Sequence, residues 1–227
     1  MPQGDERIIL KRLKVFIIVY FFGMSSYAYA KKADFQYWQT DSVSWKAAAD
    51  WKLTWSEEHY FKDDAGDYYY QEQNIGVIYS GLAKWLDLGL DYKHVIQEIS
   101  PNKWKREERP HVNATLKFNL GGYSISDRNR FEYRIREDQT DYWRYRNLLT
   151  VKLPVKWTRQ EIQPLVSDEI HVDLSHQEVN EIRLMPGFAF KITKNLNAEI
   201  VYMWRRVKSS GVWSTNNATW MRLKLEF

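Results

Sequence analysis

Residues 221–227, the last seven of the chain, alternate apolar and charged side chains and end on the aromatic ring of Phe227. A period of two describes a strand with one apolar face and one ionic face. In an outer-membrane β-barrel the apolar face of such a strand contacts lipid, the charged face lines a polar lumen, and a terminal aromatic lies at the membrane rim. This segment therefore favours a strand of a transmembrane barrel over a strand of a soluble domain.

Residues 1–30 have the three parts of a secretory signal peptide. A basic start that includes Arg7 and Lys11 precedes an apolar stretch within residues 13–24, and a small-x-small cleavage site ends at Ala30. A membrane-spanning helix needs about 20 apolar residues, so the stretch is too short for an anchor. We expect cleavage after Ala30, which leaves residues 31–227 as one barrel in the bacterial outer membrane.

Composition narrows the alternatives further. The chain has no cysteine, which excludes a disulfide framework and a thiolate metal site. Its formal net charge of +4 is too balanced to indicate binding to nucleic acid. Charged residues make up 27% and aromatic residues 16% of the chain. The wall of a barrel accommodates charged and aromatic residues together, because successive side chains face the lumen and the lipid in turn.

Alternation recurs along the chain in segments of about 10 residues. In residues 86–93, for example, Leu88 and Leu90 fall on one phase, and Asp91 and Lys93 fall on the other. Ten strands are predicted after residue 50, and residues 35–46 could supply an eleventh. Bacterial single-chain barrels have an even number of strands. Either residues 35–46 do not cross the wall, or residues 154–164 hide a further strand behind their prolines.

We therefore predict an all-β fold, an antiparallel, up-and-down transmembrane barrel of 10–12 strands that follows a cleavable signal peptide. Short turns are expected at residues 47–50, 82–84, 121–122 and 193–195. Longer, more polar loops are expected at residues 62–67, 100–110, 137–141, 172–179 and 208–217. Short turns at one end and longer loops at the other are typical of the periplasmic and extracellular ends of such barrels.

The charged phase of the strands is expected to face the lumen, where function would have to reside. Unpaired charge is too costly for a dry core, but lumen charges can pair and hydrate. The predicted ionic network consists of Glu58, Glu72, Asp91, Arg130, Glu132, Arg134, Arg136, Arg144, Arg146, Glu169, Arg183, Glu199, Arg205 and Arg222.

Two interpretations of this network remain open. In one, arginine forks bind neighbouring carboxylates and the network is a cross-linked plug that holds the strands in register. In the other, the lumen is a narrow, porin-like pore whose excess arginine favours a small anionic solute. Barrels of about 8 strands are filled by side chains and those of 16–18 leave a channel, so we favour a plug or a constricted pore.

An integral outer-membrane enzyme acting on lipid or lipopolysaccharide is the alternative function. It would need an outward His beside a Ser and a third polar group. His94 falls on the outward phase, but no Ser accompanies it. Asp168, Glu169, His171 and His176 match no compact metal signature. The sequence therefore predicts no catalytic residue, no metal ligand and no cofactor, and it favours a non-enzymatic barrel.

Five stretches of the chain resemble the domain of unknown function family 2490, a set of uncharacterised bacterial outer-membrane barrels. They are "FQYWQ" at 35–39, "ERPHVNATLKF" at 108–118, "RNRFEYRIRED" at 128–138, "YRNLLTVKLP" at 145–154 and "SDEIHVDL" at 167–174. The resemblance implies residence in the outer membrane and brings no activity. It suggests that Glu132, Arg134, Arg136 and Glu169 belong to a shared ionic core with a structural role.

The expected partners follow from this location. They are outer-membrane lipid and lipopolysaccharide, the barrel-assembly machinery acting through the C-terminal Phe227, and a small anionic solute.

Overall fold

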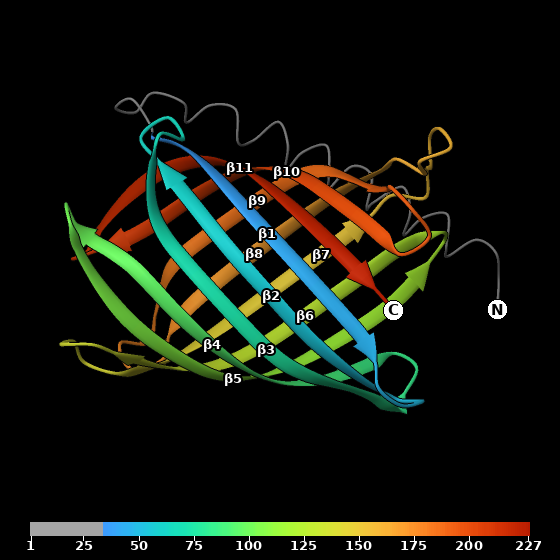
Figure 1. The fold of residues 1–227 in the computed structure, drawn as a ribbon, viewed down its shortest axis with the longest axis horizontal. Coiled ribbons are helices and arrows are strands. Elements are labelled where there is room, and N and C mark those ends of the chain that lie inside the picture. Colours follow the sequence, from blue (N-terminus) through green and yellow to red (C-terminus); the bar gives the residue numbers. More distant parts are fainter. Residues whose placement is uncertain (1–33) are drawn as a thin grey trace.

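Strands whose side chains alternate between two environments build the whole wall of the protein. The structure is a computed structural model that describes residues 34–227, and the predicted signal peptide lies outside these residues. The described chain forms one closed barrel of eleven strands (Figure 1). The strands are β1 (Phe35–Lys46), β2 (Trp51–Lys62), β3 (Asp67–Ala83), β4 (Leu86–Ser100), β5 (Lys103–Leu120), β6 (Tyr123–Arg136), β7 (Tyr142–Lys152), β8 (Gln163–Asp173), β9 (Glu178–Lys191), β10 (Leu196–Ser209) and β11 (Val212–Glu226).

The barrel predicted from the alternating pattern is confirmed, and all ten strands expected after residue 50 are present. Each strand pairs with its neighbours in sequence order, in antiparallel fashion. No helix that is both long enough and apolar enough to cross a membrane occurs among residues 34–227.

The closure of the barrel differs from the expectation of an even strand number. Residues 35–46 do form a wall strand, β1, and it pairs with β11 in parallel from Phe35 opposite Asn217 to Ser44 opposite Glu226. No strand lies in residues 154–162, where Trp157 and Ile162 form a single isolated bridge. A parallel seam accommodates an odd strand number, and it places the start of β1 and the end of β11 at opposite ends of the barrel.

The connections also differ from the predicted division into short turns and long loops. The longest connection, residues 153–162, lies at the end where short turns were expected. Residues 103–110 and 212–217, predicted as loop, instead extend β5 and β11. Their backbone groups pair with β4 and β10, because the ladder does not require an apolar face. These polar residues therefore lengthen the wall at the end of the barrel opposite to the connection 153–162.

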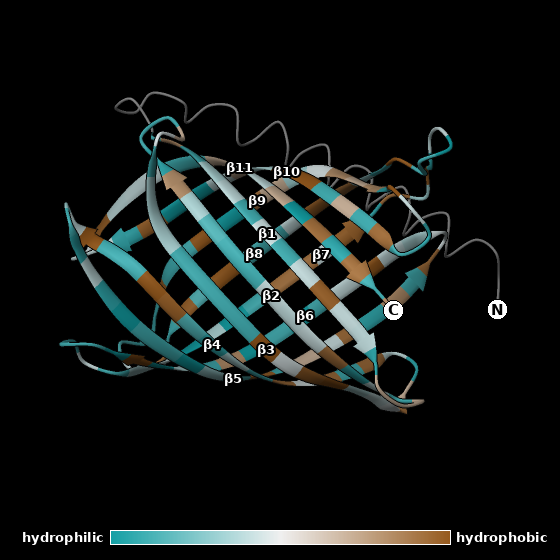
Figure 2. Cartoon of the chain, viewed as in Figure 1, coloured by the Kyte–Doolittle hydropathy of each residue, from teal (hydrophilic) through white to brown (hydrophobic). Residues whose placement is uncertain are grey.

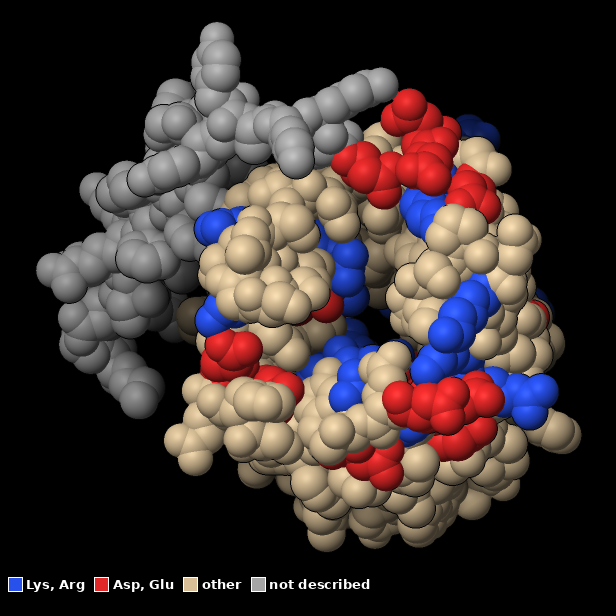
Figure 3. Space-filling view, turned by 90° about the vertical axis from the view of Figure 1, so that its left-hand side faces the viewer, with Lys and Arg blue, Asp and Glu red and all other residues tan. Residues whose placement is uncertain are grey.

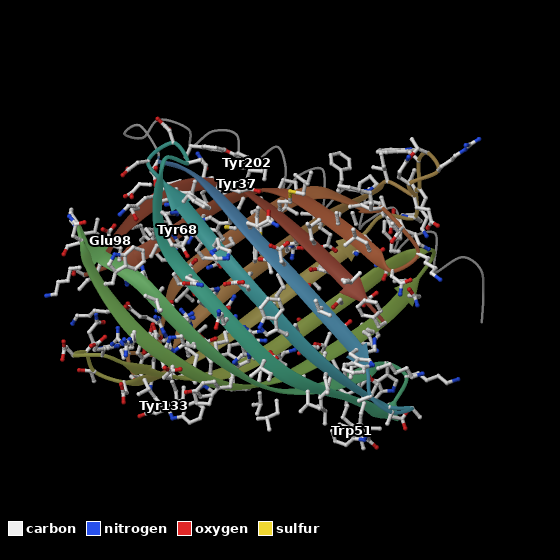
Figure 4. All side chains as sticks on the ribbon, in the orientation of Figure 1. Tyr37, Trp51, Tyr68, Glu98, Tyr133 and Tyr202 are labelled. Carbon is white, nitrogen blue, oxygen red and sulfur yellow. The ribbon has the colours of Figure 1, made fainter. Side chains whose placement is uncertain are left out.

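The outside of the wall is apolar over much of its surface. Figure 2 shows hydrophobic and hydrophilic residues interspersed along the strands, and Figure 4 shows Trp51 and Tyr133 at the outer edge of the ribbon. Ile75 is 64% exposed and Leu90 is 60% exposed. Further large apolar residues exposed on the wall include Trp45, Leu53, Trp55, Tyr92, Val112, Phe118, Phe131, Trp143, Phe188, Ile200 and Tyr202. Soluble monomers rarely expose apolar surface on this scale.

Inside the barrel, an apolar cluster fills one side of the lumen. Trp38 stacks on Tyr60 with ring centroids 3.9 Å apart, and Tyr60 stacks on Tyr70 at 4.3 Å. Met185 and Met203 are fully buried beside them. The remaining members are Val95, Leu165, Val201, Ala218 and Trp220. The cluster narrows the lumen, and its members Trp38, Tyr60, Tyr70 and Trp220 line part of the space that remains.

The parallel seam can be tested by cross-linking, because the chain has no cysteine of its own. Val43 and Leu225 are direct partners across the seam. We expect the double variant Val43→Cys/Leu225→Cys to form an intramolecular disulfide on mild oxidation, since neighbouring strands bring Cα atoms within the range of about 4.4–6.8 Å that the bond needs. Loss of maleimide labelling and a mass decrease would measure it.

The control for this experiment is Val43→Cys/Met221→Cys. Met221 pairs with Gln39, so it lies four positions away from the partner of Val43, roughly 13 Å along the strand. This variant should remain reduced. Equal cross-linking of the two variants would show that the β1–β11 register is wrong.

Candidate functional site in the barrel lumen

Most of the residues predicted to form the lumen network come together inside the barrel. Nine of the fourteen line a single cavity of about 680 Å³: Glu58, Glu72, Asp91, Arg130, Arg134, Arg144, Arg146, Arg183 and Arg205. Glu132 and Glu169 are buried behind this lining and pair with its arginines. Glu199 and Arg222 form a separate group, and Arg136 lies at the rim. As a functional assignment the set remains a prediction.

One chain of ion pairs crosses five strands, from β6 to β10. Glu169 on β8 is its centre, is 1% exposed, and accepts hydrogen bonds from Arg146 (Nη2, 2.8 Å), Arg183 (Nη1, 3.1 Å) and Arg128 (Nη2, 3.2 Å). Arg146 also lies 3.7 Å from Glu132. The register explains these contacts, because it sets Glu169 directly opposite Arg183.

This chain of ion pairs continues at both ends through further Arg–Glu pairs. On β7, Arg144 donates to Glu132, its direct partner on β6. On β9, Arg183 donates through Nε to Glu181 at 2.6 Å, and Arg205 of β10 donates to the same carboxylate. Opposite charges therefore alternate around the wall, and each carboxylate contacts at least one guanidinium.

A second chain of ion pairs runs across β3–β6. Glu72 accepts from Lys93 and from the Tyr70 hydroxyl (2.6 Å), and it lies 3.4 Å from Nη1 of Arg109. Arg109 donates through Nε to Glu107 at 2.9 Å, and Arg134 donates to the same carboxylate. This chain tethers four neighbouring strands.

Sequence analysis missed Glu107 and Arg109, because residues 100–110 were predicted as a loop. Residues on both phases of that segment are polar, so hydropathy carries no period there. The inward phase is still readable as the charges Lys105, Glu107 and Arg109 at every second position. Their alternation in sign is the signal that would have identified a strand.

The remaining predicted members lie elsewhere. Glu199 accepts from Lys152 at 2.9 Å and lies 3.1 Å from both Arg222 and Lys224, in a group separate from the cavity lining. Arg136 is the last residue of β6 and donates to Gln139 and to the Thr140 carbonyl in the following turn.

The cavity carries more basic than acidic side chains. Ten basic residues line it: Lys93, Arg109, Arg128, Arg130, Arg134, Arg144, Arg146, Arg183, Arg205 and Lys208. Five acidic residues line it: Glu58, Glu72, Asp87, Asp91 and Glu181. Glu107, Glu132 and Glu169 add carboxylates behind the lining, which still leaves a basic excess. Figure 3 looks onto the end of the barrel where β2 joins β3 and shows a central hollow bordered by charged residues of both signs.

The outward His94 has an orienting partner. Its Nδ1 lies 2.6 Å from Oε1 of Glu108, the residue opposite it on β5. Among residues 34–227, no Ser or Thr hydroxyl hydrogen-bonds to this imidazole. The pair therefore supplies an oriented base without a nucleophile.

The cluster of Asp168, Glu169, His171 and His176 does not assemble. Strand alternation sends Asp168 outward and sends Glu169 and His171 into the lumen, while His176 sits in the β8–β9 turn and binds Asp173. No group of three or more His, Asp or Glu side chains suited to a metal ion occurs within the described part of the chain.

The chain matches a known protein family. The model of a family described as "Protein of unknown function (DUF2490)" matches residues 35–216, which run from β1 into β11. The search of curated proteins found no match.

The importance of the Glu169 centre can be measured with two adjacent substitutions. Glu169→Gln leaves three guanidinium groups without their shared counter-charge, and breaking a buried ion pair costs about 3–5 kcal/mol. We expect a decrease of that size in the free energy of unfolding, measured by urea titration of the purified barrel with tryptophan fluorescence.

Asp168→Asn is the matched control. Asp168 is the neighbouring residue on the opposite face, and its Oδ1 has no hydrogen-bond partner among the described residues. The change should not lower the free energy of unfolding, because it replaces a carboxylate with a buried, unpaired oxygen by a neutral amide. Equal effects of the two variants would refute the role of Glu169 as the centre.

Proposed function

Because the chain belongs to the DUF2490 family, whose function is unknown, we propose from its own residues that it is a bacterial outer-membrane barrel with a narrow, anion-preferring lumen. The proposal has three parts: the location, the constriction of the lumen, and the charge preference. Each part draws on a different feature of the wall.

The location draws on the outer surface and on strand length. A transmembrane strand needs about 9–11 residues, and the shortest strands here, β7 and β8, have 11. A closed barrel satisfies every backbone group between strands, which hydrocarbon requires of any spanning sheet. The exposed large apolar side chains of the wall then contact lipid chains instead of water.

The constriction draws on strand number and on the lumen contents. Eleven strands lie nearer to the filled barrels of about 8 strands than to the open channels of 16–18. The aromatic and methionine cluster occupies part of the remaining space, and the ion-pair chains cross another part. A path through such a lumen admits small, partly dehydrated solutes only.

The charge preference carries the functional conclusion. Ten basic side chains against five acidic ones line the cavity, and rings of Arg or Lys select for anions in pores. The alternative of a lipid-directed enzyme has less support, because His94 has an orienting carboxylate but hydrogen-bonds to no Ser or Thr hydroxyl among residues 34–227.

The location can be tested with one outward substitution. Leu90 lies in β4 between Leu88 and Tyr92, which share its outward phase and are also exposed. If hydrocarbon covers this position, Leu90→Arg should cost about 2–4 kcal/mol of folding free energy in phospholipid vesicles, measured by denaturant titration. An exposed position in water would lose about 0.5 kcal/mol or less.

Leu120→Arg provides the control for that measurement. Leu120 is also exposed and is the last residue of β5, where a membrane interface would lie. The same substitution there should cost only about 0–1 kcal/mol. Equal costs at Leu90 and Leu120 would argue against a lipid-covered wall.

The pore can be tested in planar bilayers. We expect a small conductance whose reversal potential in a salt gradient favours chloride. Arg205→Gln removes a cavity-lining charge and should reduce this preference, whereas Arg206→Gln changes the adjacent residue, which does not line the cavity, and should not. Large, steady currents would contradict the constricted lumen, and a preference for cations would contradict the charge argument.

A further inference from the structure

We propose that the cavity contains a specific site for a small oxyanion of the phosphate or sulfate type, centred on Arg130 with Arg128 beside it. This inference rests on the proposed anion-preferring lumen and assigns it a ligand class and a binding position. It depends on one arginine whose surroundings differ from those of its neighbours.

Arg130 is buried in the wall of the cavity, with 6% of its surface exposed. It donates one hydrogen bond, from Nε to Oδ1 of Asn113 at 2.7 Å. Neither Nη1 nor Nη2 hydrogen-bonds to a described residue, and no carboxylate within residues 34–227 lies within 4 Å of this guanidinium. Its terminal N–H groups therefore remain available to a ligand in the cavity.

The other arginines that line the cavity all have carboxylate partners in the described structure. Arg109, Arg134, Arg144, Arg146, Arg183 and Arg205 each pair with Glu72, Glu107, Glu132, Glu169 or Glu181. A buried guanidinium without a counter-charge carries a large desolvation cost. A bound anion at Arg130 would supply the missing charge.

Asn113 explains why Arg130 stays unpaired. Its amide donates from Nδ2 to Oδ2 of Asp91 at 2.7 Å and accepts from Arg130 through Oδ1. Asp91 also accepts from Asn74 at 3.1 Å. The amide of Asn113 thus hydrogen-bonds to both the Asp91 carboxylate and the Arg130 guanidinium and holds them apart.

Arg128 completes the site. It lies two positions before Arg130 on β6, so both side chains project from the same face of the strand, roughly 7 Å apart at Cα. Its Nη2 contacts Glu169 at 3.2 Å, while its Nε has no hydrogen-bond partner among the described residues. Two guanidinium forks on one face match the several oxygens of a tetrahedral oxyanion better than they match a spherical halide.

The test is equilibrium binding to the purified, folded mature chain in detergent. Isothermal titration with inorganic phosphate and with sulfate, at constant ionic strength in chloride, should show saturable binding to one site. Arg130→Gln should weaken that binding by roughly tenfold or more, because charge-assisted hydrogen bonds are lost. Arg206→Gln, which removes an arginine that does not line the cavity, should leave it unchanged.

A second variant keeps the experiment decisive if Arg130→Gln fails to fold. The double variant Asp91→Asn/Asn113→Asp exchanges the amide and the carboxylate, so one hydrogen bond between positions 91 and 113 is kept while the carboxylate moves against the Arg130 guanidinium. It should fold and lose oxyanion binding, because the new carboxylate occupies the site. Heat-modifiable migration on a gel would check folding in each variant. Unchanged binding in folded Asp91→Asn/Asn113→Asp, or no saturable binding by the unmodified protein, would overturn the inference.

The binding measurement separates this inference from the proposed pore. Anion conductance in bilayers without saturable phosphate or sulfate binding would support the proposed pore and contradict the oxyanion site. Oxyanion binding without conductance would support the site and contradict the pore.

Discussion

Ion pairing between neighbouring strands is the interaction on which the interior of this barrel depends. Strand alternation sends every second side chain to the lumen, and where these side chains are charged the antiparallel register decides which charges meet. Glu132 meets Arg144, and Glu169 meets Arg183, because they are direct cross-strand partners. Glu132 contacts two arginines of β7, and Glu169 contacts arginines of β6, β7 and β9, which offsets the cost of removing those charges from water. A slip of one residue would send the whole set to the outer wall. The network thus fixes the register as well as the charge balance.

Three polar residues on the outward side of the wall hydrogen-bond to one another. Asp127, Asn129 and Asn147 fall on the outward phase of β6 and β7, among apolar neighbours such as Phe131 and Leu149. They are not left as separate polar groups. Asn147 donates to both Asp127 and Asn129, and Asn129 donates to Asp127 at 3.3 Å. Hydrogen bonding among themselves lowers the cost of their apolar surroundings. The wall can therefore carry polar residues without losing its apolar character.

Sequence analysis predicted most of the fold, because alternation is a local property that each strand displays by itself. It identified the ten strands after residue 50 and nine of the charged residues that line the cavity. It was wrong where the outcome depended on pairing. The expectation of an even strand number assumed that the first and last strands pair in antiparallel fashion. Instead, β1 pairs with β11 in parallel, and no local sequence pattern encodes that pairing. Glu107 and Arg109 were missed because both phases of their segment are polar. Arg136 is the last residue of β6 and donates to the following turn. The local period of hydropathy therefore predicts individual strands, whereas the pairing that closes the barrel and the ends of the strands depend on residues elsewhere in the chain.

The surroundings of Arg130 also follow from cross-strand pairing, which here places an amide opposite the arginine instead of a carboxylate. The register sets Arg130 opposite Asn113 on β5 and opposite Arg146 on β7, so neither cross-strand partner is a carboxylate. Arg146 is already held by Glu169 at 2.8 Å, and Asn113 is held by Asp91. The surrounding network is thus complete without Arg130, and its terminal nitrogens face the cavity without a protein acceptor. In a lumen whose other arginines cross-link the wall, this one is positioned for something that enters from outside. The amide at position 113 hydrogen-bonds to both Asp91 and Arg130 without supplying a counter-charge to the arginine, and this keeps the anion site open.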